Sequence, residues 1–301
     1  MKKIYSIALL AAIAATALSC SKEEKVPAGR KAISVELGCS TATRTDLVNG
    51  SKVYWSKNDK NIWCITDAGS FNKLTSTEGT QKASKTFSGT IPAGETPLFY
   101  FYDANRTSKG TISWKGNGLI RHLLEKAQTC GNDTFNNTYN YAIAKADERV
   151  MRNLMGYLKW TNNGNAIRSV KFETVTSGEY LAGYFDVTYD SNEPYCRKYN
   201  YNGMSATAGS PDVTSTVGAT TIPSDKSYYA IVIPGTYHGL KATVTLGSGS
   251  TIVLKTDETV VVERGKYIDF GVMPKEAVTN VVGTLTFTSG QDFEPGWSLN
   301  F

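Results

Sequence analysis

Residues 83–102 have the sequence ASKTFSGTIPAGETPLFYFY, in which apolar and aromatic residues flank a turn. Its first half places Phe87 among small residues as far as Ile91, and residues 92–94 (Pro-Ala-Gly) supply a turn. Its second half, Pro97–Tyr102, is an aromatic run typical of a buried strand. The stretch therefore predicts two strands joined by a turn.

The composition favours strands in the rest of the chain as well. The sequence holds 17 Tyr and 27 Gly with many Ser and Thr, a mixture typical of strands and turns. Residues 32–37, for example, alternate three aliphatic residues with polar ones, as a half-buried strand does. Further strands are predicted at 53–55, 62–65, 141–146, 154–160, 170–175, 184–189, 228–233, 242–246, 252–254, 260–262, 265–270 and 281–288.

One segment, residues 118–129 (GLIRHLLEKAQT), has the spacing of a helix. Its apolar residues lie three and four apart and would share one face, which leaves His122 on the polar side. Residues 193–212 are rich in Asn, Tyr, Gly and Pro and predict a long surface loop. We therefore expect an all-β chain of two tandem Greek-key β-sandwich domains with one short helix.

The length fits two domains behind a leader. About 280 residues follow the leader, which is room for two domains of ordinary size. We expect a signal peptide at 1–19, a flexible tether at 20–31, an N-terminal domain at 32–148, a C-terminal domain at 149–275 and a C-terminal strand and tail at 276–301. The strand at 281–288 has no obvious place in a finished two-domain sandwich, and an unpaired strand needs a partner.

The first 20 residues have the features of an export signal. A basic start at Lys2 and Lys3 precedes an apolar run over residues 4–18, too short for a permanent membrane helix. Residues 17–19 offer a small-x-small cleavage site, as in a plain secreted protein. Cys20 directly after Ser19 instead resembles a bacterial lipobox, which implies a lipid on Cys20 and an anchor in the outer membrane.

The charged residues that follow Cys20 have two interpretations. Residues 22–24 (Lys-Glu-Glu) resemble an acidic tag for export to the cell surface, and they also fit an ordinary solvated charge cluster. Without Lys2 and Lys3 the net charge falls from +5 to +3, and no long basic run occurs. Nucleic acid is therefore not expected as a partner.

Signals for chemistry are weak. The chain has two histidines and no phosphate-binding glycine loop, GxSxG or HExxH motif, so we expect neither an enzyme nor a cofactor or metal. Besides Cys20, four scattered cysteines are present. They allow two disulfides in one of three pairings, and free, partly buried thiols are an equal alternative. These cysteines are Cys39, Cys64, Cys130 and Cys196.

Several short motifs, taken in their order along the chain, resemble the fimbrillin family of surface pilins and pilus-associated lipoproteins. The first half carries Arg44-Thr45, Trp55, Asp59, Ile62, Phe87-Ser88-Gly89 and the aromatic run Phe99–Tyr102. The second half carries Leu181-Ala182-Gly183, an aromatic strand ending at Pro234-Gly235, and Gly265-Lys266 followed by Ile268 and Phe270. The resemblance spans roughly residues 33–271. We expect the tryptophans and Phe87 in the core in any case.

The resemblance implies a fimbrial subunit or pilus-associated lipoprotein that assembles with other fimbrial subunits and adheres to a host or bacterial surface ligand. In that family a trypsin-like protease cuts after an arginine, here Arg44. The cut would remove the strand that carries Ile33, Val35 and Leu37 and open a groove for a neighbour's strand. The candidate donor strand carries Val281, Val282, Leu285 and Phe287. Alternatively Arg44 stays uncut, as in an anchor or tip subunit.

A second hypothesis is a glycan-binding surface lipoprotein. Tyrosines in loop-like sequence could stack on sugar rings, and they are also common spacers in β-rich chains. The candidates are Tyr139, Tyr141, Tyr195, Tyr199 and Tyr201.

Overall fold

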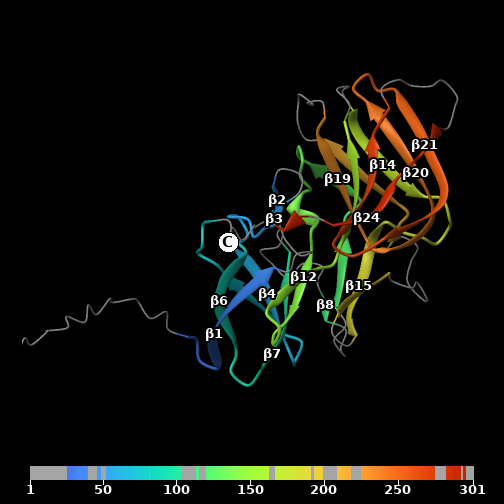
Figure 1. Cartoon of the computed structure of the whole chain (residues 1–301). Coiled ribbons are helices and arrows are strands. Elements are labelled where there is room, and N and C mark those ends of the chain that lie inside the picture. The colour runs from blue at the N-terminus through green and yellow to red at the C-terminus, as the bar shows by residue number, and fades with distance from the viewer. Residues whose placement is uncertain are drawn as a thin grey trace, which may run out of the picture.

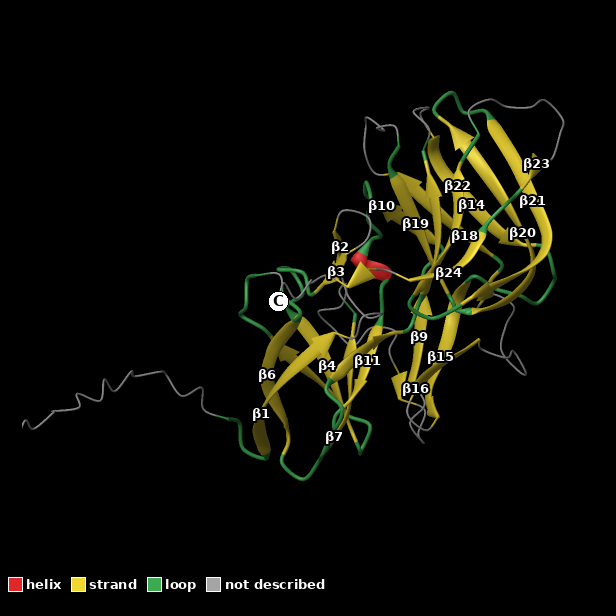
Figure 2. Ribbon diagram, viewed as in Figure 1, coloured by secondary structure: helices red, strands yellow, loops and turns green. Residues whose placement is uncertain are grey.

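A computed structural model describes most of the chain. The described residues are 26–39, 46–48, 52–80, 82–103, 113–114, 120–162, 167–190, 193–198, 209–217, 225–274, 283–292 and 294–295. Nearly all regular structure in them is strand, which confirms the predicted all-β class (Figure 2). The one helical turn among these residues is η1 (Asn137–Tyr139). No helix in this part of the chain is long and apolar enough to cross a membrane.

The first unit is a closed β-barrel with its own core (Figure 1). The core of the barrel contains Trp55, Phe87 and Tyr102, all fully buried. Around the barrel the strands follow the order β1 (Arg30–Cys39), β12 (Val150–Asn153), β11 (Ala142–Lys145), β7 (Pro97–Tyr102), β4 (Asn61–Thr66), β5 (Phe71–Thr75) and β6 (Ser84–Pro92). The two strands predicted in residues 83–102 are β6 and β7. They are joined by a turn, as predicted, but each pairs with other neighbours.

The second unit contains two sheets packed face to face. One holds β10 (Ala127–Cys130), β18 (Asp212–Val217), β14 (Ile167–Thr174), β20 (Gly235–Leu246), β21 (Thr251–Val262) and β23 (Gly283–Thr284). The other holds β19 (Ser227–Val232), β13 (Gly156–Thr161), β22 (Lys266–Val272) and β24 (Thr288–Asp292). Their inner residues form one apolar cluster that includes Trp160, Phe172 and Phe270. The arrangement is a β-sandwich.

Two smaller sheets complete the fold. A sheet beside the sandwich holds β16 (Glu193–Lys198), β15 (Ala182–Asp190), β9 (Ile120–Leu124) and β8 (Ser113–Trp114), with β17 (Gly209–Ser210) on β15. A three-stranded sheet holds β2 (Asp46–Val48), β3 (Lys52–Tyr54) and β25 (Glu294–Pro295). The strands β16 and β17 lie in the stretch expected to be a long loop, so that expectation was wrong over 193–198 and 209–210.

The helix expected at residues 118–129 is a second correction. The described part of that segment forms β9 and the start of β10. In β9 the buried residues are Ile120, His122 and Leu124, which alternate with half-buried Arg121 and Leu123. His122 is therefore fully buried and does not lie on a polar surface. Its polar side chain interrupts the apolar period of two in the sequence.

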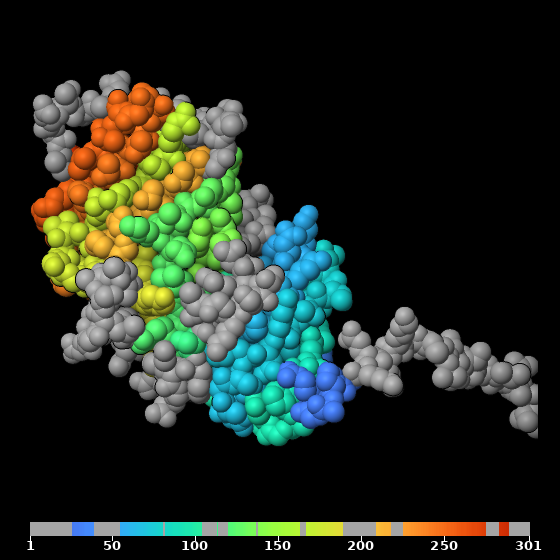
Figure 3. Space-filling model, turned by 180° about the vertical axis from the view of Figure 1, so that it is seen from behind, coloured from blue at the N-terminus to red at the C-terminus, as the bar shows by residue number. Residues whose placement is uncertain are grey.

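The barrel and the other sheets share a third apolar cluster. It joins Trp63 and Phe101 of the barrel to Phe185 of β15 and Tyr229 of β19. In Figure 3 the blue and cyan residues of the barrel accordingly lie against the green and yellow residues of the second unit. Strands β9 and β10 pair with β15 and β18 before the chain returns to the barrel as β11 and β12. The domain boundary near residue 148 stays a prediction.

Candidate functional site

The first strand, β1, is bound very unequally on its two sides. Nine register pairs join it to β6, from Arg30 opposite Pro92 to Gly38 opposite Ser84. Among the described residues two pairs join it to β12, and both are at its end. Figure 1 shows β1 and β6 side by side along their length. The ladder to β6 therefore supplies most of the main-chain contacts of β1.

The side chains of β1 alternate as its sequence predicts. Val35 and Leu37 are buried in the barrel core and Ile33 packs against it, whereas Ser34 and Glu36 are exposed. Along β6, Ile33 lies opposite Gly89, Val35 opposite Phe87 and Leu37 opposite Lys85. The three aliphatic residues are thus the contribution of β1 to the core.

Gly89 is required by the close approach of β5 and β6. A Cβ atom at this position would lie 2.8 Å from Leu74 Cδ2 and 2.8 Å from the carbonyl oxygen of Lys73. Any other residue would push β5 away from β6. The glycine of the Phe-Ser-Gly motif therefore shapes the wall that β1 covers.

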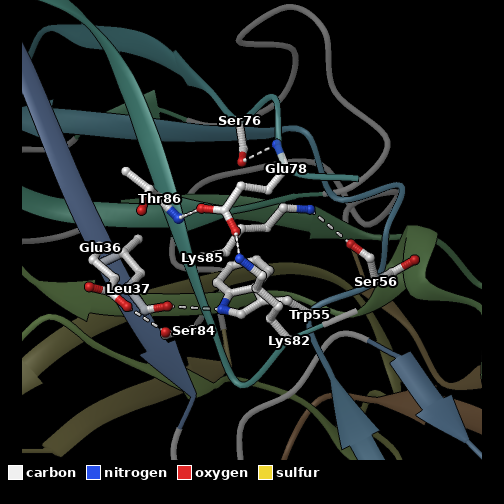
Figure 4. A network of polar contacts seen from close by, with 10 residues as sticks. All are labelled: Glu36, Leu37, Trp55, Ser56, Ser76, Glu78, Lys82, Ser84, Lys85 and Thr86. Atoms are coloured by element: carbon white, nitrogen blue, oxygen red, sulfur yellow. Dashed lines mark hydrogen bonds and ion pairs between the residues drawn. The ribbon is translucent and has the colours of Figure 1, made fainter. Parts of the chain in front are cut away.

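Polar contacts hold both ends of β1. At its start, Arg30 donates from Nε to Thr90 Oγ1 at 2.8 Å and from Nη2 to Asn72 Oδ1 at 2.6 Å. Near its end, Trp55 Nε1 donates to the carbonyl oxygen of Leu37 at 3.0 Å (Figure 4). Because the indole is fully buried, this hydrogen bond has no water to replace it.

A buried charged group lies beside Trp55. The side chain of Lys85 is almost fully buried, and its Nζ donates to the carbonyl oxygen of Ser56 at 3.0 Å (Figure 4). The carboxylate of Asp59 accepts from the Ser56 amide and from the hydroxyl of Tyr102. Burial lowers the pKa of Lys85, and the nearby Asp59 charge opposes that change. These residues fix the Trp55 loop against the inside of the barrel.

Three residues of the fimbrillin-like motifs, Trp55, Phe87 and Tyr102, pack together in the barrel core. The ring of Trp55 lies 5.2 Å from that of Phe87 and 5.4 Å from that of Tyr102, measured between centroids. All three are core residues, as expected for Trp55 and Phe87. Trp55 therefore has two roles: its ring fills the barrel core, and its indole N–H donates a hydrogen bond to β1.

The outer face of β1, β5 and β6 carries a groove. Its volume is about 1,030 Å³, and its walls combine hydroxyl-bearing side chains, Lys73 and Glu78 with the apolar residues Val26, Pro27, Ala32 and Ile33. Ser34 and Ser88 bridge β1 and β6 across it, with their Oγ atoms 2.9 Å apart. The groove therefore presents both hydrogen-bonding groups and apolar surface, including the partly buried Ile33 of β1.

The C-terminal segment is paired with its own chain. The backbone N–H of Leu285 donates to the carbonyl oxygen of Lys255 at 2.8 Å, and its side chain is buried in the sandwich core. Phe287 packs against the same core, with its ring centroid 6.1 Å from that of Phe270. Val281 and Val282 lie outside the described residues. The described half of the candidate donor strand therefore occupies a site in the second unit.

Beyond Phe287 the segment continues to two more partners. Strand β24 pairs antiparallel with β22, where Tyr267 lies opposite Gln291. Strand β25 then pairs parallel with β3, where Glu294 lies opposite Lys52. The C-terminal segment thus connects the sandwich to the small sheet that follows β1 in the sequence.

The remaining predicted residues divide into two groups. Cys20 and Arg44 lie outside the described residues, as do Tyr199 and Tyr201. Tyr141 is buried, and its hydroxyl donates to the carbonyl oxygen of Leu123 at 3.1 Å, so it is not an exposed stacking residue. Tyr139 is partly buried against the shared cluster. Tyr141 is therefore no longer a candidate for stacking on a sugar ring.

Cys64 and Cys130 are free and buried. Cys64 and Cys130 form no disulfide, which decides between the two alternatives for these residues. Burial raises the pKa of Cys64 to about 12 and that of Cys130 to about 11. Among the residues described, no group of three or more His, Cys, Asp or Glu could hold a metal ion.

Sequence reasoning missed a buried acid–base pair at the contact between the two units. His122 Nε2 lies 3.0 Å from Asp103 Oδ2, and both side chains are almost completely buried. The imidazole is surrounded by the rings of Phe101, Tyr141 and Phe185. The pair could have been predicted only if residues 120–124 had been taken as an alternating strand with His122 at a buried position.

Comparison with known proteins gives no sequence relative. No protein-family profile matches the chain, and no curated protein matches it. Among solved structures, the chain is similar to the tip fimbrial protein Mfa3 of Porphyromonas gingivalis with a C-terminal truncation. The TM-score is 0.39 at 8% identity, over 82% of this chain and 96% of that one.

Two further solved structures come from Bacteroides. A proposed cell adhesion protein from Bacteroides fragilis gives a TM-score of 0.33 at 12% identity, over 80% of this chain and 84% of that one. A proposed adhesin from Bacteroides ovatus gives 0.23 at 10% identity, over 74% and 82% of the two chains.

Proposed function

We propose that this chain is a cell-surface fimbrial subunit or pilus-associated lipoprotein that assembles by strand exchange and contributes to adhesion. The observation that carries the proposal is the way β1 sits in the barrel. Strand β1 has nine register pairs with β6 and two with β12 among the described residues. It contributes the aliphatic side chains of Val35 and Leu37 to the barrel core, and Ile33 packs against that core. A strand bound in this way can be replaced by another strand of the same pattern.

The position of Arg44 supports removal of β1. Arg44 lies in the sequence between β1 and β2, so a cut after it separates β1 from the rest of the barrel. The protein would then expose the edge of β6 and the core positions left by Val35 and Leu37. An exposed edge of this kind pairs readily with a second chain.

The C-terminal segment is the proposed donor to a neighbouring subunit. Val281, Val282, Leu285 and Phe287 give a strand-forming sequence with several large apolar side chains. Main-chain hydrogen bonds would supply much of the affinity, and apolar side chains in alternate positions would set the register. No cofactor or catalytic residue is needed for such an assembly.

The leader supports delivery to the cell surface. We propose that Cys20 carries a lipid in the outer membrane and that residues 20–31 form a tether between lipid and barrel. A chain that keeps Arg44 intact would remain anchored and would serve as an anchor or tip subunit. A chain cut after Arg44 would serve as a polymerising subunit.

N-terminal sequencing of the mature surface protein tests the proposal. A polymerising subunit starts at Thr45, whereas an anchored one starts at the lipidated Cys20. Arg44→Gln should prevent the cut and the assembly of filaments seen by electron microscopy, and Lys31→Gln should leave both unchanged. A protein that starts at Thr45 and stays monomeric at all concentrations would contradict strand exchange.

A further inference from the structure

The small sheet β2–β3–β25 joins the residues that follow the proposed cleavage site to the end of the C-terminal segment. Strands β2 and β3 follow Arg44 in the sequence, and β25 comes from the candidate donor segment. Strand β3 lies between them, with β2 on one edge and β25 on the other. In Figure 1 the red β25 end of the chain accordingly lies at the blue β2 and β3.

Trp55 connects this small sheet to β1. It follows directly after Tyr54, the last residue of β3, and its backbone pairs with Lys82 through hydrogen bonds of 3.0 and 3.3 Å. Its indole Nε1 donates to the carbonyl oxygen of Leu37 on β1. A continuous series of contacts therefore runs from β1 through Trp55 and β3 to β25.

Removal of β1 would act on every step of this series. The indole would lose its hydrogen-bond acceptor and the neighbouring side chains of Val35 and Leu37, which belong to the same core cluster. A buried donor left without a partner is unfavourable, so the indole would move and β3 would lose its support. In the described part of the chain, β25 is joined to β3 by two register pairs.

We propose that Trp55 and the β2–β3–β25 sheet form a latch that keeps the C-terminal segment on its own chain while β1 is in place. Loss of β1 loosens the latch, so that the donor segment is then held on its own chain only by its contacts with the sandwich. This inference rests on the proposed function, and it adds an order of events: a subunit offers its donor strand after its own groove has opened. A subunit that is to polymerise would therefore not assemble before it is processed.

Hydrogen–deuterium exchange on the full mature chain tests the latch. Trp55→Phe keeps an aromatic ring in the core, removes the indole N–H and makes the side chain smaller, as the control variant does. We expect at least a tenfold faster exchange of residues 288–294 in this variant, with β1 still present. Trp63→Phe is the matched control, because Trp63 Nε1 is buried without a hydrogen-bond partner among the described residues. The control should leave exchange of residues 288–294 unchanged.

A second arm avoids dependence on the folding of the Trp55 variant. Deletion of residues 293–301 removes β25 and leaves the barrel core intact, and we expect faster exchange in β3. Cleavage of the unaltered protein after Arg44 should likewise speed exchange of residues 288–294, and the Arg44→Gln protein under the same protease should not change. Equal exchange of those residues in the Trp55→Phe, cleaved and unaltered proteins would overturn the latch.

The proposed function and the latch fail in different ways. Cleaved protein that assembles into filaments without any change in C-terminal exchange keeps the proposed function and overturns the latch. Cleaved protein that shows faster C-terminal exchange and never assembles keeps the latch and overturns strand exchange.

Discussion

Lys85 shows how a single residue can hold a loop in place from inside a core. Its side chain is almost fully buried, and it reaches the backbone of Ser56 instead of solvent. A buried ammonium group is unfavourable unless it is hydrogen-bonded and has an opposite charge nearby. Ser56 and the carboxylate of Asp59 supply these two conditions.

Lys85→Met is expected to destabilise the protein by about 1.5–3 kcal/mol, the usual cost of losing a hydrogen bond to a charged group. Lys82→Met is the matched control, because the side chain of Lys82 is half exposed and forms a surface ion pair with Glu78. The substitution leaves the backbone hydrogen bonds between Lys82 and Trp55 in place. Its effect should stay within about 0.5 kcal/mol. Urea unfolding of the three proteins measures both differences, and equal midpoints would show that the Lys85 contacts contribute little.

The two buried thiols give a prediction about pH. The pKa values of about 12 for Cys64 and about 11 for Cys130 leave both protonated, and therefore unreactive, at neutral pH. In a protein with Cys39→Ser and Cys196→Ser and without Cys20, a disulfide reagent at pH 8 should label neither thiol until denaturant is added. Labelling of the folded protein should begin only as the pH approaches 11. Rapid reaction at pH 8 would mean that the thiols are exposed.

At the scale of the element, the C-terminal segment shows what a strand assignment leaves open. The sequence predicts a strand at 281–288 and no partner for it. In the structure Leu285 joins the sandwich core, β24 pairs with β22, and β25 pairs with β3. The partners could not be predicted because they depend on edges that only the finished sheets create.

Leu285→Ala is expected to destabilise the second unit by about 2–5 kcal/mol, because it leaves a cavity in a packed core. Leu98→Ala is the control, since Leu98 is 36% exposed and a cavity cannot form there. Thermal unfolding followed by circular dichroism distinguishes the two. A loss of stability no greater than that of Leu98→Ala would show that the segment binds its own chain only loosely.

Prediction from the sequence worked best where one physical rule governed the pattern. The alternation of Ile33, Val35 and Leu37 gave β1 correctly, and the aromatic run gave β7. Residues 120–124 were misassigned because His122 occupies a buried strand position, so the visible apolar residues kept only a helical spacing. The partner that makes this burial acceptable, Asp103, is remote in sequence. The predictions for Cys20 and Arg44 rest on the sequence, because both residues lie outside the described part of the chain.

At the scale of the whole molecule, the shared apolar cluster joins the barrel to the other sheets. Phe101 of the barrel and Phe185 of β15 both contact His122, and Tyr141 stacks between the rings of Phe101 and Phe185. Strands β9 and β10 interrupt the barrel sequence and pair outside it. The two units are therefore expected to unfold together.

Calorimetry of the mature chain should show one cooperative transition, coincident with the loss of far-UV circular dichroism and the change in tryptophan fluorescence. Phe185→Ala should lower the stability of the whole molecule by about 3–5 kcal/mol. Val272→Ala, at a residue that is 61% exposed, should have almost no effect. Two separate transitions in the unaltered protein would show that the shared cluster does not couple the units.

The unequal binding of β1 has a mechanical consequence under the proposal that Cys20 anchors the chain to a lipid. A subunit held at Cys20 and pulled by its partners would carry the tension through β1, because β1 is the first strand between the tether and the barrel. The pull would act along the strand, so the nine pairs with β6 would be loaded together in shear and would not open one after another. Once Arg44 is cut as proposed, the covalent connection between tether and barrel is lost, and this non-covalent ladder is what resists detachment of the subunit from the cell by force.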